Sequence, residues 1–239
     1  MAVYFNGLQV VLNINIEIGM PSNTILVLAT TNKGKTAEIR ERLDSFPIAI
    51  RNLDDFGPLP PIVEDGATFE ENAYKKASLT ARYLGFAALA DDSGLVVDHL
   101  HGAPGVHSAR YAGEEASDQQ RCQKLLRELG AAQNRDAHFE CVLSLAVPSG
   151  PALTYEARCH GRIAHRPAGE NGFGYDSLFF YPRLDKTFAQ MSIEEKSRVS
   201  HRGKALRELS SEFDKVMAWL KNHMPQTETT GCLGGKLDH

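Results

Sequence analysis

The sequence predicts an α/β fold built on a mixed β-sheet, and two observations carry this prediction. In the first half of the chain, apolar segments of strand length alternate with polar turns and amphipathic segments, an order typical of α/β proteins rather than of helical bundles or β-sandwiches. Further along, two segments of alternating polarity flank a turn at residues 148–151. A hairpin of this kind makes the sheet mixed rather than wholly parallel.

The first unit of the pattern is a strand followed by a helix. Residues 25–29 form a short apolar run that indicates a buried strand. After the polar turn at residues 30–35, apolar positions recur at helical spacing until Pro47 stops the helix. Pro, Gly and Asp are concentrated in residues 54–66, which we therefore expect to form a loop.

The second unit is a helix followed by a strand. Thr68 is a suitable N-cap and Gly85 a suitable C-terminal glycine, so the sequence predicts a helix between them. Residues 86–90 form the next apolar strand. We expect it to end in a turn at residues 91–94, because Asp, Ser and Gly favour turns.

The second half of the chain adds helices and the hairpin strands. A helix is expected over residues 117–130, and strands over residues 139–147 and 155–159. A capping box at Ser192 begins a C-terminal apolar stripe. Ser200 can cap a second segment, so the stripe forms one helix or two.

No repeat or linker interrupts the chain, so one domain is expected over residues 25–222. Residues 1–24 form an N-terminal extension. Within it, residues 14–18 alternate isoleucine with polar residues, which indicates an extra edge strand or a loosely attached segment. The tail, residues 223–239, is rich in Thr and Gly and is expected to be disordered.

The composition limits which kinds of binding partner and which cellular compartment are expected. The net charge of -4 gives no overall basic field, so nucleic acid is not an expected partner. The N-terminal stretch lacks a basic region and is interrupted by polar residues, so neither a signal peptide nor a membrane span is expected. The four cysteines show no zinc-ligand spacing, and reduced thiols in a cytoplasmic protein are the better interpretation.

Four polar patches, all expected on turns, carry the candidate chemistry. The first is Thr-Thr-Asn-Lys-Gly-Lys at residues 30–35. Small residues let backbone N–H groups approach an anion, two lysines neutralise it, and the following helix presents its positive N-terminus. The segment does not match the P-loop pattern, because Ala29 stands where a glycine is required. Alone, the patch fits a phosphate site or a solvated turn.

The second patch joins Glu64 to the start of the helix that follows it. Carboxylates near a helix N-terminus complement the helix dipole, and this suffices to explain Glu70 and Glu71. Asn72 and Lys76 lie one helical turn apart, so both side chains can address the same ligand.

The third patch contains Asp91 and Asp92, directly after the strand at residues 86–90. Open α/β sheets bind ligands at the carboxyl ends of their strands. Adjacent acids repel each other unless a cation or a donor offsets them, and magnesium prefers hard oxygen ligands. The alternative is an ordinary Asp-Ser-Gly turn.

In the fourth patch, Phe173 stands between Gly172 and Gly174. An aromatic ring with close backbone approach suits a pocket in which a nucleobase stacks. Asp176 or nearby main chain can then read the edge of the base. Candidate cations follow downstream: Lys196, His201 and Arg202. The alternatives are a tight aromatic turn and a charged helix face.

Together the patches resemble the noncanonical purine nucleoside triphosphate pyrophosphatases, the inosine triphosphatase family. The resemblance extends over residues 25–220. Its most specific stretches are residues 69–73, 90–95, 102–111, 172–176 and 200–202.

The resemblance implies an elongated mixed β-sheet with flanking helices, two lobes around a central substrate cleft, and a homodimer. It also implies magnesium-dependent hydrolysis of dITP, ITP and XTP to the nucleoside monophosphate and pyrophosphate. By the same resemblance, Asp92 is the catalytic carboxylate, and Asp92 and Glu64 are metal ligands. The implied substrate-binding residues are Thr30, Thr31, Asn32, Lys33, Gly34, Lys35, Lys76, Ser93, Phe173, Gly174, Tyr175, Asp176, Lys196, His201 and Arg202.

Residue chemistry is compatible with this activity. Asp92 and Glu64 would hold magnesium, whose charge acidifies a bound water, and Asp92 would orient that water and accept its proton. A 6-oxo purine accepts a hydrogen bond where adenine donates one. Donors near Phe173 and in the His201–Arg202 pair would therefore be left unpaired by ATP, at about 1–3 kcal/mol each.

Three alternatives stay open. A house-cleaning pyrophosphatase for a pyrimidine nucleotide would use the same chemistry on another base. A regulatory module that binds a nucleotide without cleaving it is disfavoured by the clustered acids, because they do not help to bind a polyanion unless a metal is present. A P-loop kinase or ATPase is disfavoured by Ala29.

Overall fold

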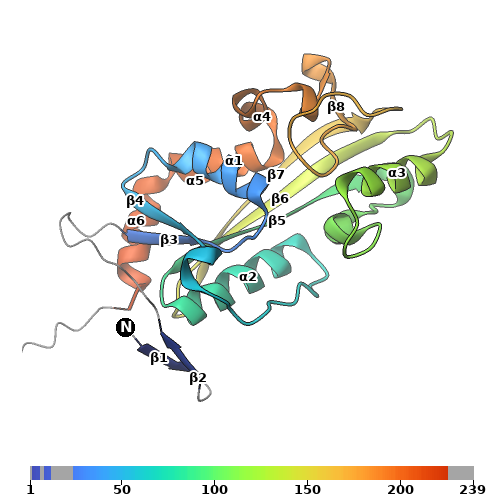
Figure 1. Cartoon of the computed structure of the whole chain (residues 1–239). Helices are drawn as coiled ribbons and strands as arrows, with labels where there is room; N and C mark the ends of the chain where they lie inside the picture. The colour runs from blue at the N-terminus through green and yellow to red at the C-terminus, as the bar shows by residue number, and fades with distance from the viewer. Residues whose placement is uncertain (1, 6–7, 12–23, 226–239) are drawn as a thin grey trace, which may run out of the picture.

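A seven-stranded mixed sheet organises the protein, in the order β4-β3-β5-β6-β7-β8-β9. The computed structural model describes residues 2–5, 8–11 and 24–225. The long central strands give the molecule its elongated shape (Figure 1), and the predicted α/β fold with a mixed sheet is confirmed. The strands are β3 (Thr24–Leu28), β4 (Ile48–Asn52), β5 (Ala87–Val97), β6 (Asp136–Ala146), β7 (Ala152–Ile163), β8 (Phe179–Tyr181) and β9 (Lys186–Thr187).

Helices cover both faces of this sheet (Figure 1). On one side lie α1 (Lys33–Leu43), α4 (Ile193–Val199), α5 (His201–Ser211) and α6 (Phe213–His223); on the other lie α2 (Phe69–Leu84) and α3 (Asp118–Leu129). None of the helices in the described part of the chain has the length and apolar character needed to cross a membrane.

The helix ends follow the predicted caps. The Thr68 side chain accepts a hydrogen bond from the Glu71 backbone and begins α2, and Gly85 ends that helix in the left-handed conformation. Ser192 begins α4 in a capping box. The C-terminal stripe forms three helices where one or two were expected, because Ser200 caps α5 and the chain turns again before α6.

Small side chains bring α2 close to the sheet. Ala77 and Ala81 of α2 pack against Ala88 and Ala90 of β5, all of them fully buried. Alanine surfaces allow a helix backbone to approach a sheet closely, since no long side chain separates them. The side chains of α2 that face the sheet therefore reach the residues of β5 directly.

One expectation is wrong: residues 91–94 do not form a turn. They lie inside β5, which pairs with β6 from Ala88 to Val97 without interruption. Antiparallel pairing along this whole length overrides the low strand propensity of Asp, Ser and Gly. The parallel pairing with β3 stops earlier, at Leu28 opposite Leu89. The two acids therefore follow the end of β3, on a strand that continues past it.

Three short strands were not predicted. β4 begins directly after the helix stop and pairs in parallel with β3, and β8 and β9 extend the other edge of the sheet. Segments of two to five residues give too little periodicity to be read from sequence. Near the N-terminus, β1 (Ala2–Phe5) and β2 (Leu8–Val11) form an antiparallel pair that is separate from the main sheet.

The extension and the tail fall mostly outside the described residues. Residues 14–18, where an extra edge strand was one expectation, and residues 226–239 of the expected tail lie outside them. The beginning of that tail, residue 223, is the last residue of α6.

Candidate active site

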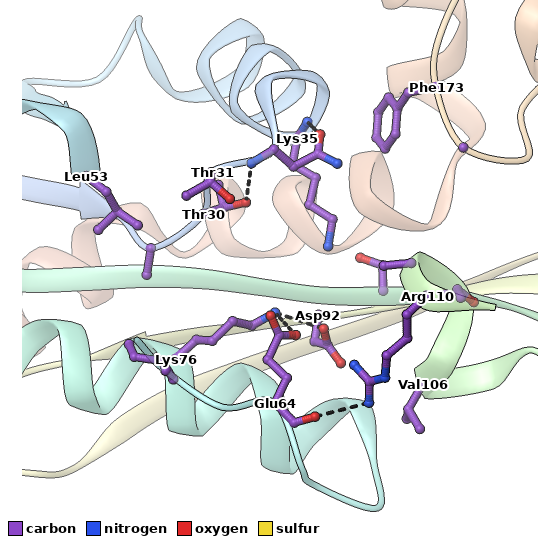
Figure 2. A pocket seen from close by; sticks show the side chains of 18 of the residues that line it. Thr30, Thr31, Lys35, Leu53, Glu64, Lys76, Asp92, Val106, Arg110 and Phe173 are labelled. Atoms are coloured by element: carbon purple, nitrogen blue, oxygen red, sulfur yellow. Dashed lines mark hydrogen bonds and ion pairs between the residues drawn. The ribbon is translucent and has the colours of Figure 1, made fainter. Parts of the chain in front are cut away.

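A cavity of about 700 Å³ lies where β5 extends beyond the end of β3. The N-terminus of α1, helix α2 and the loop at residues 172–176 contribute to its walls (Figure 2). The residues predicted from sequence that line it are Thr30, Thr31, Asn32, Lys35, Glu64, Lys76, Asp92, Ser93, Phe173, Gly174, Tyr175, Asp176, Lys196, His201 and Arg202. Lys33 and Gly34 do not line it: Lys33 is exposed, and Gly34 lies beneath the Phe173 ring.

Lys76 joins the two carboxylates that were expected to bind metal. Its Nζ lies 2.8 Å from Asp92 Oδ1 and 2.8 Å from Glu64 Oε2 (Figure 2). Burial raises the pKa of Asp92 above its ordinary value, although the Lys76 and Lys35 ammonium groups oppose the rise. Burial also acts to raise the pKa of Glu64, but the charge of Lys76 outweighs it and the pKa is lowered. Of the two, Asp92 is the stronger proton acceptor.

The loop that carries Glu64 is tied down by its neighbours. Asn72 Oδ1 accepts a hydrogen bond of 2.8 Å from the Gly66 backbone, and Arg110 donates to the Glu64 carbonyl at 3.1 Å. Asn72 therefore holds the loop through its backbone, while Lys76, one turn further along α2, reaches the cavity. The two side chains were expected to address the same ligand, but in the structure only Lys76 lines the cavity, whereas Asn72 holds the loop at Gly66.

Asp91 forms a buried charge centre behind the cavity. Its carboxylate lies 2.6 Å from Lys35 Nζ and 2.6 Å from Arg202 Nε. Burial would raise the pKa of Asp91, but Arg202 and then Lys35 overcome it and hold the pKa well below its ordinary value. Asp91 thus stays ionised and fixes two of the cations that face the cavity.

Glu38 is a buried acid of the site that the sequence analysis missed. It lies on α1, 2.6 Å from Lys196 Nζ, and also pairs with Arg202. Arg202 and Lys196 outweigh the effect of burial and lower the pKa of Glu38. Its sequence signal was weak, since only its spacing of three residues from Lys35 placed it on the same side of a helix.

At the far end of the cavity, the loop at residues 172–176 is held on several sides. Asp176 accepts hydrogen bonds from the Phe173 backbone at 3.0 Å and from Lys196 at 2.5 Å. The Gly174 backbone donates to Asp118 on α3 at 2.6 Å. The Lys196 ammonium lies 4.7 Å from the centre of the Phe173 ring. The ring is therefore fixed in position as one wall of the cavity.

His201 also lines this end, stacked on Phe139 with ring centres 4.6 Å apart. Burial and the neighbouring Arg202 hold the pKa of His201 well below its ordinary value, so the imidazole is neutral. Its Nδ1 is buried without a hydrogen-bond partner among the described residues. A neutral ring nitrogen of this kind can donate to or accept from a ligand edge, depending on its tautomer.

Gly34→Ala is expected to weaken the stacking wall. A Cβ at this position would come within 2.3 Å of the Phe173 ring, so the ring has to move. Base stacking contributes about 1–3 kcal/mol, and for the purine triphosphates that the resemblance implies as substrates we expect KM to rise about tenfold with little change in kcat. Steady-state kinetics measure this.

A double-mutant cycle provides the control for Gly34→Ala. In a Phe173→Leu background the extra methyl group has a smaller side chain to displace. Gly34→Ala should therefore raise KM by much less in this background than in the unmodified protein. Equal effects in both backgrounds would show that the methyl group acts elsewhere in α1.

The chain is similar in sequence to a known protein family and to several of its members. A family model described as the Ham1 family matches residues 26–212. The chain is 64% identical to a dITP/XTP pyrophosphatase of Syntrophobacter fumaroxidans, over 83% of this chain and 85% of the relative. It is 55% identical to a protein of the same name from Desulfotalea psychrophila, over 84% and 91% respectively.

Solved structures agree with the sequence relatives. A HAM1 protein from Coxiella burnetii has a TM-score of 0.74 and 43% identity, covering 80% of this chain and 99% of the other. The Ham1 protein of Staphylococcus aureus has a TM-score of 0.73 and 39% identity, covering 81% of this chain and all of the other.

Proposed function

The chain belongs to the Ham1 family, and on that premise we propose that it hydrolyses the noncanonical purine nucleoside triphosphates dITP, ITP and XTP. The products are the nucleoside monophosphate and pyrophosphate, so the enzyme cleanses the nucleotide pool. One observation carries the proposal. A single cavity holds paired carboxylates and lysines at one end and an aromatic wall with hydrogen-bonding groups at the other.

The triphosphate is expected at the Lys35 and Lys76 end. Both ammonium groups approach Asp91 or Asp92 from opposite sides of the cavity, from α1 and α2 (Figure 2). Asn32 caps α1 and its neighbours Thr30 and Thr31 line the cavity, so the positive end of the α1 dipole faces the same region. These charges offset the triphosphate locally, although the chain as a whole is acidic.

Magnesium fits the donors at this end. Asp92 and Glu64 supply carboxylate oxygens, and Asp92 Oδ2 is buried with no hydrogen-bond partner in the described part of the chain. Within the same residues, no group of three or more His, Cys, Asp or Glu can cage a metal. Two carboxylates suffice for Mg²⁺, which commonly completes its coordination with phosphate oxygens and water. When bound, the ion supplies charge neutralisation and a more acidic water.

Asp92 is the proposed general base. It lines the cavity, and its Oδ2 has no hydrogen-bond partner among the described residues, so the carboxylate can contact the attacking water. It takes a proton from the attacking water as the water oxygen bonds to the α-phosphorus. The bond from this phosphorus to the bridging oxygen breaks, and pyrophosphate leaves with the bonding electrons. Lys76, 2.8 Å from Asp92, orients the carboxylate for this transfer.

The base is expected to stack on Phe173 and to be read by His201 and Lys196. Lys196 already binds Asp176 and Glu38, which leaves its remaining donor capacity for a 6-oxo group. The unpartnered Nδ1 of His201 offers a second contact. Adenine presents an amino donor in place of the oxygen, so a buried donor opposite it stays unpaired at a cost of about 1–3 kcal/mol.

A substrate panel tests reaction and specificity together. The protein is incubated with dITP, ITP, XTP, ATP and dTTP, with magnesium or with excess chelator, and pyrophosphate and phosphate are measured separately. We expect pyrophosphate release from the first three substrates only, and only with magnesium. Orthophosphate release would indicate a phosphatase, turnover of dTTP alone a pyrimidine enzyme, and tight binding without turnover a regulatory module.

Glu64→Gln tests the metal assignment. The amide is a weaker ligand than the carboxylate, so the magnesium concentration for half-maximal activity should rise about tenfold or more, with kcat largely recovered at saturating metal. The matched control is Asp65→Asn, since Asp65 is an exposed neighbour that pairs with Lys75. An unchanged magnesium dependence in Glu64→Gln would remove Glu64 from the ligand set.

The homodimer and the cytoplasmic location stay predictions of the resemblance and of the sequence. Light scattering across a dilution series measures the oligomeric state, and a constant monomer mass would contradict the dimer.

A further inference from the structure

Helix α2 presents three polar side chains at one-turn intervals on one face: Asn72, Lys76 and Thr80. The first two have evident tasks, since Asn72 holds the Gly66 backbone and Lys76 binds two carboxylates. Thr80 is 1% exposed and lines the cavity. Its hydroxyl has no hydrogen-bond partner in the described part of the chain.

A buried hydroxyl without a partner destabilises the folded protein, because it has lost its water without a replacement. Helical threonines usually avoid this by bonding to the carbonyl one turn back. The Thr80 hydroxyl makes no such bond. Valine would have the same shape without the penalty. A group that enters the cavity is therefore the natural partner of this hydroxyl.

The direction of α2 shows which end of a ligand would meet Thr80. The helix begins at Phe69, whose ring lies against Gly94 of β5: a Cβ on this glycine would be 2.8 Å from it. Next to Gly94 on β5, Leu95 pairs with Phe139, on which His201 stacks. The beginning of α2 thus lies toward the base-reading end of the cavity.

Moving along α2 from that end, Lys76 reaches Asp92, and Thr80 follows about 6 Å further on along the helix axis. Ala29 and Leu53 line the cavity and directly follow β3 and β4, at the edge of the sheet away from the base-reading residues. A nucleotide with its base on Phe173 and its α-phosphate at Asp92 therefore extends its terminal phosphates toward Thr80.

We propose that the Thr80 hydroxyl donates a hydrogen bond to the β- and γ-phosphates, the part that leaves as pyrophosphate. This inference rests on the proposed function for the direction of the substrate. Pyrophosphate gains negative charge as the bond to the α-phosphorus breaks, and a donor already in place next to Lys76 stabilises that charge. Thr80 thus contacts the leaving group directly and stabilises it.

Binding of pyrophosphate tests the inference apart from turnover. Isothermal titration of inorganic pyrophosphate in magnesium is compared for the unmodified protein, Thr80→Val and Thr80→Ser. A hydrogen bond to a charged group corresponds to a loss of roughly tenfold or more, so Thr80→Val should bind about tenfold more weakly. Thr80→Ser, which keeps the hydroxyl, should bind nearly as well as the unmodified protein.

Ser144→Ala is the matched control. Ser144 is also buried, and its hydroxyl also lacks a partner among the described residues, but it does not line the cavity. Both Thr80→Val and Ser144→Ala should raise Tm, because each removes an unpaired buried hydroxyl. Only Thr80→Val should weaken pyrophosphate binding.

Two results would overturn the inference: unchanged pyrophosphate binding in Thr80→Val, or an equal loss in Thr80→Ser and Thr80→Val. The first would show that the hydroxyl does not take part in binding pyrophosphate. The second would assign the effect to the shape of the side chain. Failure of the proposed function has a different signature, namely no pyrophosphate release from dITP by the unmodified protein. The binding measurement then still decides the role of Thr80.

Discussion

Asp92→Asn is expected to lower kcat for dITP by about a thousandfold, within the range of a lost general base, while the protein stays folded. Asparagine has the same shape, but its amide cannot accept the proton of the attacking water and is a poorer magnesium ligand. The loss should appear in kcat, because it removes an interaction that develops in the transition state. Pyrophosphate release measures turnover, and circular dichroism confirms the fold.

Asp65→Asn is the control for Asp92→Asn, since Asp65 is an acid of the adjoining loop that pairs with Lys75 at the surface. It should retain full turnover. Asp92→Glu separates charge from position: it keeps the carboxylate but moves it by one methylene, and partial activity is expected. Near-normal kcat in folded Asp92→Asn would exclude Asp92 as the base.

Asp91→Ala is expected to lower the free energy of unfolding by about 3–5 kcal/mol, the usual cost of removing one partner from a buried ion pair. Asp91 is 1% exposed and contacts both Lys35 and Arg202. Without it, Lys35 loses its carboxylate partner, and Arg202 is left with one carboxylate, Glu38, and with the Ser93 hydroxyl. Urea unfolding followed by circular dichroism measures the change.

The control for Asp91→Ala is Asp136→Ala, which breaks the pair between Asp136 and Arg162, two side chains that are more than half exposed. Exposed pairs contribute little to stability, so this variant should unfold at nearly the same urea concentration as the unmodified protein. If Asp91→Ala were equally neutral, the buried network would not hold the site together as described.

Local signals were sufficient for much of the fold. Caps such as Thr68, Ser192 and Ser200 act within one helical turn. The two-residue period of β7 and of the first half of β6 follows from burial of one face, while residues 141–146 of β6 are buried on both. These effects depend on neighbours in sequence, so they can be read from sequence. The short strands β4, β8 and β9 carried too little of this information and were missed.

Asp91 and Asp92, which were expected in a turn, show what the local sequence could not predict. By itself the sequence determined that Asp91 and Asp92 are adjacent, that they follow an apolar strand and that they need cations nearby. Only the tertiary structure decided their separate tasks. Pairing with β6 keeps both in β5 and points successive side chains to opposite faces. Asp91 is therefore buried against Arg202, which is 111 residues away in the chain, whereas Asp92 faces the cavity with Lys76. A contact across that separation depends on the packing of α1, β5 and α5 together, which no local propensity encodes.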